Sequence, residues 1–317
     1  MKRIFGIVII LLLSSVALIF IPTACKQQPQ KDTISISGAF ALYPLTVKWA
    51  EEYKKIHPEV KIDVSAGGAG KGMTDVLSGM VDLAMFSRSV SPEETTKGAW
   101  SMAVSRDAVV PMINSDNPHL AAIKQRGLKQ TEFVDIFLNK KYTTWNQLLG
   151  ISGNDKLNVF TRSDACGAAE MWGKYLGKNQ ESLEGIGVFG DPGMADAVKK
   201  DPLGLGYNNV IYAYDIKSRK NYPGLEVLPI DINNNGKIDP DENFYTCLDS
   251  IMNAIRNRKY PSPPARDLYL ISKGAPGKKS VRAFLEWILT DGQKYVNEAG
   301  YVQLKPEQII TEKAKLK

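Results

Sequence analysis

The amino-acid sequence predicts an α/β protein with two lobes that are connected by two crossover segments. Strand patterns and helix patterns alternate from the first folded residues, which is typical of a largely parallel sheet with helices on its faces. Two long, apolar, extended stretches at 104–113 and 267–272 lie far apart in the chain, and each could pass from one lobe to the other. The 317 residues are too many for one ordinary hydrophobic core and suit two.

The N-terminus has the three parts of an export signal. The basic start MKR precedes an uncharged apolar run at 4–21, and small residues follow it up to Cys25. The run is also nearly long enough to span a bilayer, so a retained membrane anchor is the alternative. Cys25 after Pro-Thr-Ala resembles a bacterial lipobox, in which the signal is cut before a cysteine that receives the lipid. We therefore expect a signal peptide at 1–24 and a lipidated Cys25 with a polar tether at 25–32, which would anchor the protein to a membrane in the periplasm or at the cell surface.

The first lobe begins with the order strand, helix, strand, helix, strand. Alternating residues at 33–37 and 60–64 predict two strands, and a buried strand is expected at 82–85. The helix between the first two strands is predicted by apolar residues spaced by four, four and three positions, namely Leu45, Trp49, Tyr53 and Ile56. Glycines end the second strand, and the next helix is expected at 72–78.

The rest of the chain is expected to build a second lobe and then to return to the first. Helical patterns occur at 128–140, 142–149, 243–258, 278–290 and 293–300. Strand patterns occur at 157–161, in the segment GLGYNNVIYAYD and at 225–231. We expect lobe one to comprise 33–110 and 266–317, and lobe two to comprise 111–265. A ligand site would lie in the cleft, where several strand-to-helix turns meet.

Charge and reactive residues argue against several classes of function. The formal net charge of +6 at pH 7 is spread along the sequence, so nucleic-acid binding has little support. His57 and His119 are the two histidines, and neither lies in a motif that would supply a base to Cys166. We therefore expect no catalysis, and an exported hydrolase that uses Cys166 is the weaker alternative. Besides Cys25 the sequence has Cys166 and Cys247, which leaves both a disulfide and free thiols open.

The segment RSDACGAAE at 162–170 has the pattern of an anion-binding turn. An arginine, and an aspartate two places on, precede small residues that begin a helix. Backbone N–H groups at the start of a helix are unpaired donors at the positive end of the helix dipole, and arginine adds a planar, permanently charged fork. The turns GAFALYP at 38–44 and AGGAGKG at 66–72 also precede helices. All three turns could direct amides into one cleft.

Several segments, in one order, resemble the phosphate-binding proteins of bacterial phosphate ABC transporters. They are YPLTVKWAEEYKKIHPEVKIDVSAGGAGKGMTDVLSGMVDLAMFSR, DAVVPMINSDNP, FVDIFLNKKYTTWNQL, RSDACGA and LYLISKG, and the likeness extends over about 33–304. The resemblance implies the type II periplasmic-binding-protein fold, which closes on inorganic phosphate and presents it to a membrane permease. It also implies a monomeric transport protein and not an enzyme.

The resemblance also assigns positions to the binding site. In the family, the first turn supplies a hydroxyl residue and an aromatic, and the second supplies a serine. The loop after the VDLAM-like strand supplies an acid that accepts a proton from phosphate, and the fourth motif has the pattern Arg-x-Asp-Gly-Ser-Gly-Thr. The ligand-binding residues that this implies are Phe40, Ala41, Ala69, Gly70, Ser87, Arg88, Arg162, Cys166, Gly167 and Ala168.

Most hydroxyl groups of the family pattern are absent from this chain. Ala69 stands in place of the serine of the second turn, and Cys166 and Ala168 replace the Ser and Thr of the fourth motif. A hydrogen bond to a charged group contributes about 1.5–3 kcal/mol, so several such losses would weaken anion binding by orders of magnitude unless other groups replace them. The available replacements are Ser87, Arg88 and Lys71.

These departures affect the choice of ligand. Because Ser87 occupies the position of the acid, the simplest means of rejecting sulfate is lost. We expect the protein to bind an inorganic oxyanion such as phosphate and to deliver it to an ABC transporter permease. The alternative is the same fold with an altered pocket, which acts as a sensor or accessory protein or binds a different anion.

The segment DINNNGKIDPDE at 231–242 matches the twelve-residue calcium loop. Gly236 permits its sharp turn, and Ca²⁺ is a hard cation that takes oxygen ligands. The expected ligands are Asp231, Asn233, Asn235, the Lys237 carbonyl, Asp239 and Glu242. Because a strand pattern precedes the loop, we expect a strand–loop–helix site that holds a structural Ca²⁺. An asparagine-rich turn that binds nothing is the alternative.

Overall fold

The computed structural model describes residues 32–317. The signal peptide expected at 1–24, the lipidated Cys25 and the tether up to residue 31 lie outside the described residues. Within 32–317, no helix is long and apolar enough to cross a membrane.

One mixed sheet of nine strands runs through the described residues. The strand order is β2-β1-β3-β9-β4-β7-β5-β6, and β8 pairs with β4. β1 pairs in parallel with β2 and β3, and β5 pairs in parallel with β6 and β7, so each half of the sheet has a parallel part. The strands are β1 (Asp32–Gly38), β2 (Val60–Ala66), β3 (Leu83–Phe86), β4 (Ala99–Asn114), β5 (Asn158–Arg162), β6 (Ile186–Val188), β7 (Gly204–Asn209), β8 (Leu225–Val227) and β9 (Ala265–Lys273).

Helices alternate with these strands, as the sequence pattern predicts. The helices are α2 (Tyr43–Ile56), α3 (Ala69–Leu77), α4 (Pro92–Thr96), α5 (Leu120–Arg126), α6 (Gln130–Phe137), α7 (Trp145–Leu149), α8 (Gly167–Tyr175), α9 (Gly190–Lys200), α10 (Val210–Ala213), α11 (Leu248–Arg256), α12 (Lys279–Ile288), α13 (Lys294–Glu298) and α14 (Pro306–Ala314), with short 3₁₀ helices η1 (Gln180–Ser182) and η2 (Asp291–Gln293). In α2 the buried face holds Leu45, Trp49 and Tyr53, whereas Ile56 at its end is exposed.

Two helices begin at positions other than those expected. α3 begins at Ala69 and not at Gly72. Gly72 is therefore within the helix, where the lack of a side chain allows α3 to pack closely on β1. A Cβ at Gly72 would lie 2.6 Å from the Cα of Gly38. α11 begins at Leu248 and not at 243, since residues 240–242 form a turn at the end of the calcium-type loop and 243–247 are not helical. The helix expected directly after the loop is therefore not formed.

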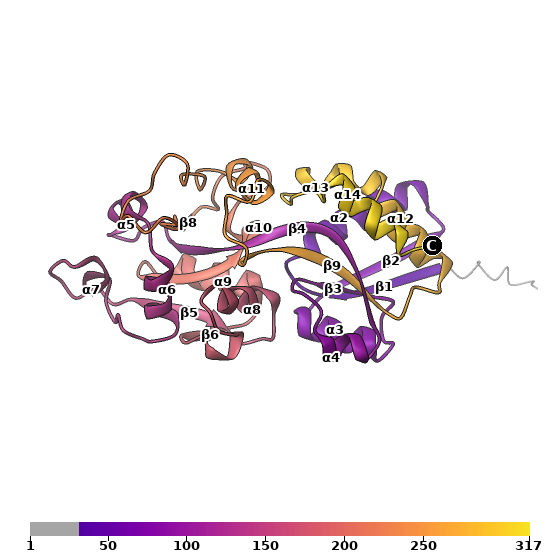
Figure 1. Cartoon of the computed structure of the whole chain (residues 1–317), viewed down its shortest axis with the longest axis horizontal. Helices are drawn as coiled ribbons and strands as arrows, with labels where there is room; N and C mark the ends of the chain where they lie inside the picture. Colours follow the sequence, from indigo (N-terminus) through magenta and orange to yellow (C-terminus); the bar gives the residue numbers. More distant parts are fainter. Residues whose placement is uncertain (1–31) are drawn as a thin grey trace, which may run out of the picture. The chain divides into compact units, whose positions relative to one another are not determined.

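The two crossover segments are confirmed and lie in β4 and β9. The part of β4 from Ala99 to Ala108 pairs antiparallel with β9, and the part from Val109 to Ile113 pairs antiparallel with β7. β9 in turn pairs antiparallel with β3. Figure 1 shows β4 and β9 running side by side from one group of elements to the other. These two strands therefore connect the two halves of the fold.

Two large hydrophobic cores lie on either side of these crossings. One contains side chains from β1, α2, β3, α12 and the first part of β4, and includes the fully buried Trp49 and Phe86. The other contains side chains from α6, α8, β7, α11 and the later part of β4, and includes the fully buried Trp145 and Trp172. Along β4 the membership changes between Val104 and Ala108. The fold is therefore the two-lobed α/β fold that the sequence predicts.

Candidate functional site

Turns from the two lobes meet at the start of α3 and the start of α8. The N–H of Gly70, in the first turn of α3, donates a hydrogen bond to the carbonyl oxygen of Ala165 over 3.2 Å. Gly167, the first residue of α8, lies against Ser87: a Cβ there would be 2.2 Å from the Ser87 Oγ and 2.3 Å from its carbonyl oxygen. The structure therefore brings Gly70, Ser87 and Gly167 together, and residue 167 must be glycine for this approach.

The first turn, before α2, also faces the second lobe. The ring of Phe40 makes an edge-on contact with Phe189, with 6.2 Å between the ring centroids. The hydroxyl of Tyr212 donates to the carbonyl oxygen of Phe40 over 3.0 Å. Ala41 is buried, and its carbonyl accepts a hydrogen bond from Tyr301 over 2.8 Å. Neither Phe40 nor Ala41 offers a hydroxyl, so these two residues can serve an anion only through their backbone N–H groups.

Arg162, at the end of β5, is buried between two carboxylates. Its Nε and Nη2 donate to the two oxygens of Asp164 over 2.8 and 2.7 Å. Its Nη1 lies 3.0 Å from Oδ2 of Asp191, the second residue of α9. Burial raises the pKa of Asp191, and the charge of Arg162 acts in the opposite direction. The sequence analysis assigns Arg162 to binding of the anion, but its positive charge is already balanced by carboxylates within the protein.

A second buried arginine, Arg266, lies at the start of β9. Its Nε donates to the carbonyl oxygen of Ser87 over 3.2 Å, and its Nη2 donates to Oδ1 of Asn209. Asp107 is the residue opposite Arg266 on β4, and its Oδ2 lies 3.7 Å from Nη2 of Arg266. Asn209 also donates to Asp191, so the two arginines belong to one buried network.

Sequence reasoning missed Arg266, Asp107 and Asp191. The available signal was charged residues in or next to the two crossing stretches, Arg106 and Asp107 in one, and Arg266 and Asp267 at the start of the other. That signal does not say that the two strands pair, and pairing is what places these charges together. Asp191 follows a glycine at a helix start, a position that carries no special mark in the sequence.

Cys166 caps α8 in place of the serine of the family pattern. Its Sγ accepts a hydrogen bond from the N–H of Ala169 over 3.4 Å. Burial raises the pKa of the Cys166 thiol to about 12, which leaves almost no thiolate at neutral pH. Cys166 and Cys247 are both free, so they form no disulfide with each other. Ala168, the next helical residue, is buried and offers no polar side-chain atom.

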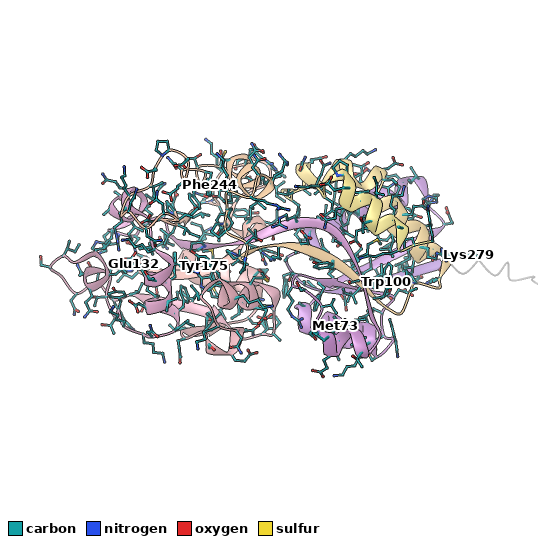
Figure 2. The ribbon with its side chains drawn as sticks, viewed as in Figure 1. Met73, Trp100, Glu132, Tyr175, Phe244 and Lys279 are labelled. Carbon is teal, nitrogen blue, oxygen red and sulfur yellow. The ribbon has the colours of Figure 1, made fainter. Side chains whose placement is uncertain are left out.

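Arg88 lines a pocket of about 500 Å³ together with Gly70, Ala165 and Cys166. It forms two hydrogen bonds with Glu94, of 2.9 and 2.7 Å, and stacks on Phe86. α3 and α4 line this pocket from one lobe, and α8 and η1 line it from the other. Met73, labelled in Figure 2, contributes from α3. Lys71 pairs with Asp75 and is half exposed.

The loop at 231–242 is held together by its acidic side chains. Asp231 accepts hydrogen bonds from the N–H groups of Asn235 and Gly236, over 3.1 and 2.8 Å. Glu242 accepts from the backbone of residues 232, 233 and 239. Asp239 accepts from the side-chain amides of Asn233 and Asn235, and pairs with Lys237 over 2.9 Å.

The carboxyl side chains of Asp231 and Glu242 are both buried. Among residues 32–317, no group of three or more His, Cys, Asp or Glu side chains is arranged to hold a metal ion. The residues expected to supply oxygen ligands lie together in one loop, but the side-chain amide nitrogens of Asn233 and Asn235 donate to Asp239. Calcium binding stays a prediction.

The two lobes and the meeting of strand-to-helix turns between them are the arrangement of the periplasmic-binding-protein fold. A family model described as a PBP superfamily domain matches residues 23–292. The chain therefore belongs to the PBP superfamily.

Named relatives give the comparison more detail. The phosphate-binding protein PstS of Xylella fastidiosa is 25% identical over 320 residues, which cover 89% of this chain and 84% of the relative. The PstS of Methanocaldococcus jannaschii is 26% identical over 335 residues, which cover 90% and 85%. Among solved structures, a putative phosphate ABC transporter substrate-binding protein of Clostridium perfringens, with bound phosphate, has a TM-score of 0.71 at 20% identity, over 86% of this chain and all of that one. An ABC-type phosphate transport receptor of Vibrio cholerae has a TM-score of 0.61 at 18% identity, over the same shares.

Proposed function

We propose that this protein is an extracytoplasmic solute-binding protein that takes a small inorganic oxyanion, phosphate in the first instance, into the cleft between its lobes. It would deliver the anion to the permease of an ABC transporter. We further propose that it is a monomer, held at the membrane by a lipid on Cys25. Membership of the PBP superfamily and the names of the PstS relatives support this function.

The observation that carries the proposal is the meeting of two helix starts beside two buried arginines. The first-turn N–H groups of α8, at Gly167 and Ala168, have no acceptor within the helix. Gly167 packs against Ser87, whose hydroxyl can also donate. Helix N-termini and guanidinium groups are the donors that oxyanions use most often in proteins. These donors favour an oxyanion as the ligand.

Binding by this site is expected to be weaker than in a site with the full family pattern. Ala69 and Ala168 supply no hydroxyl donor, and Asp164 and Asp191 already neutralise Arg162. That ion pairing is the specific observation in favour of the second candidate function, a sensor or accessory protein with an altered pocket.

Titration calorimetry of the mature protein with phosphate and with sulfate tests the proposed function. We expect one phosphate per chain, and binding about tenfold tighter after Ala69→Ser, because one hydroxyl donor to a charged ligand is regained. Ala121→Ser, an exposed position on α5, is the matched control and should leave the affinity unchanged. A folded protein that binds neither anion would exclude the transport function and leave the accessory function.

We also propose a structural Ca²⁺ site in the loop at 231–242. Side-chain oxygens of Asp231, Asp239 and Glu242, with the amide oxygens of Asn233 and Asn235, have the chemistry that Ca²⁺ prefers. Burial of two of these carboxylates in one short loop supports the proposal, because a cation would relieve their mutual repulsion. The two asparagine amides would have to turn their oxygens inward. Melting curves with calcium and with a chelator measure the effect.

A further inference from the structure

Five ionisable side chains form one connected cluster; four of them are buried and Asp164 is partly buried. They come from β4, β5, α9, β9 and the turn after β5. The members, called here the charge cluster, are Asp107, Arg162, Asp164, Asp191 and Arg266. Asn209 bridges its two halves, since its amide nitrogen donates to Asp191 and its oxygen accepts from Arg266.

The charge cluster is not neutral when all its members are ionised. Two guanidinium groups face three carboxylates, which leaves one excess negative charge in a buried region. An anion that enters the cleft beside it would add further negative charge where solvent cannot screen it. Anion binding at this place therefore requires that a carboxylate lose its charge.

Three buried atoms of the cluster have no hydrogen-bond partner, namely Nη1 of Arg162, Nη1 of Arg266 and Oδ2 of Asp107. Nη1 of Arg162 still lies within ion-pair distance of Asp191, at 3.0 Å, so Arg266 and Asp107 hold the two atoms with no close partner. Arg266 is also tied by its Nε to the Ser87 carbonyl, and Ser87 lies against the first residue of α8. Nη1 of Arg266 is thus a donor without a partner on a guanidinium group whose Nε reaches Ser87. Oδ2 of Asp107, the residue opposite Arg266 on β4, is an acceptor without a partner.

We propose that Arg266 is a second anion-binding arginine and that Asp107 takes up a proton when the anion enters. The proton comes from solvent, stays on Asp107 Oδ2 while the anion is bound, and returns to solvent on release. This inference rests on the proposed function, because it concerns the same cleft. It states that the cleft binds an oxyanion when Asp107 is protonated.

The surroundings of Asp107 suit this role. Burial raises the pKa of Asp107 to about 6, while the charge of Arg266 on β9 acts to lower it and that of Asp191 on α9 to raise it. The hydroxyl of Tyr301 also faces the cluster from the segment after α13. A carboxyl group with this pKa is ionised at neutral pH and is protonated by a small additional negative potential.

The test uses sulfate as the probe, because sulfate does not itself titrate near neutral pH. Calorimetry at one pH in two buffers of different ionisation enthalpy counts the protons taken up for each sulfate bound. We expect close to one proton at pH 7.5, and an affinity that rises about tenfold for each unit of pH decrease down to about pH 6. Sulfate binding with no proton uptake and no pH dependence would overturn the inference alone. No binding of sulfate or phosphate at any pH would overturn the proposed function with it.

Two variants separate the roles of the acid and the arginine. Asp107→Asn should bind sulfate at pH 7.5 at least tenfold more tightly than the unaltered chain, without proton uptake. Asp215→Asn, a partly exposed aspartate just after α10, is the control and should keep the proton uptake. Arg266→Gln should weaken sulfate binding more than tenfold at every pH. If Arg266→Gln does not fold, Asp107→Asn decides, and a pH dependence that survives in Asp107→Asn contradicts the inference.

Discussion

At the scale of single residues, burial distinguishes two arginines that have the same kind of partner. Arg162 and Arg88 each form two short hydrogen bonds with one carboxylate. The side chain of Arg162 has no exposed surface, whereas that of Arg88 is 24% exposed. A buried charge without its partner costs far more than an exposed one. The two arginines should therefore differ greatly in their effect on stability.

Arg162→Gln should lower the free energy of unfolding by about 3–5 kcal/mol, because Asp164 and Asp191 would both lose their buried counter-charge. Arg88→Gln is the matched control, with an expected loss of about 1 kcal/mol or less. Urea denaturation followed by circular dichroism measures both. Equal losses in the two variants would contradict the electrostatic account of Arg162.

At the scale of elements, the sequence predicts long periodic segments well and short irregular ones poorly. The face of α2 and the strands β1 to β3 follow from repeated spacing, which depends only on local sequence. In the sequence, the glycines at the start of α3 resemble a turn. In the structure Gly72 is part of the helix, and its close approach to Gly38 explains why a glycine stands there. The motif order places the turns of the candidate site. It does not give the partners of Arg162, because they depend on how distant elements pack.

The calcium-type loop is an element whose predicted ligand follows from local spacing alone. Calcium at about ten times its dissociation constant would add about 1.4 kcal/mol of stability, which corresponds to a rise of about 2–4 °C in melting temperature. Dissociation constants of about 10⁻⁴–10⁻³ M are usual for extracellular sites of this kind, so millimolar calcium is required. Differential scanning calorimetry with calcium, magnesium or a chelator measures the shift.

Variants of two neighbouring acids provide the control for the calcium experiment. Glu242→Gln should abolish the calcium-dependent shift, since position twelve of the loop would lose its carboxylate. Asp241→Asn, at a position that the motif leaves unconstrained, should keep it. If the unaltered chain melts at the same temperature with calcium and with chelator, the loop is a turn that binds no metal.

At the scale of the whole molecule, the lobes touch through the aromatic contact of Phe40 with Phe189 and, at the starts of α3 and α8, through backbone atoms and small residues. The Gly70 N–H donates to the Ala165 carbonyl, and Gly167 lies against Ser87. Because these contacts involve main-chain atoms and residues without side chains, a single added methyl group changes the distance between the lobes. Closure of the cleft therefore depends on glycine at one position.

Gly167→Ala should hold the lobes apart, because its Cβ would lie 2.2 Å from the Ser87 Oγ and 2.3 Å from the Ser87 carbonyl oxygen. We expect a larger radius of gyration in small-angle X-ray scattering. Gly277→Ala is the control, since nothing lies within 4 Å of the added Cβ and its backbone is not in the left-handed region. Scattering curves of Gly167→Ala and of the unaltered chain that superimpose would show that the lobes close without this contact.

The pairing of β3 with β9 has a consequence for synthesis of the chain. Ala84 lies opposite Ile271, so the edge of β3 stays uncovered on the ribosome until nearly the whole polypeptide has been made. The elements between β4 and β9 are contiguous, and most of their partners emerge early. The part of the molecule that is translated first is therefore completed last, and its open strand edge is where nascent chains would most need a chaperone.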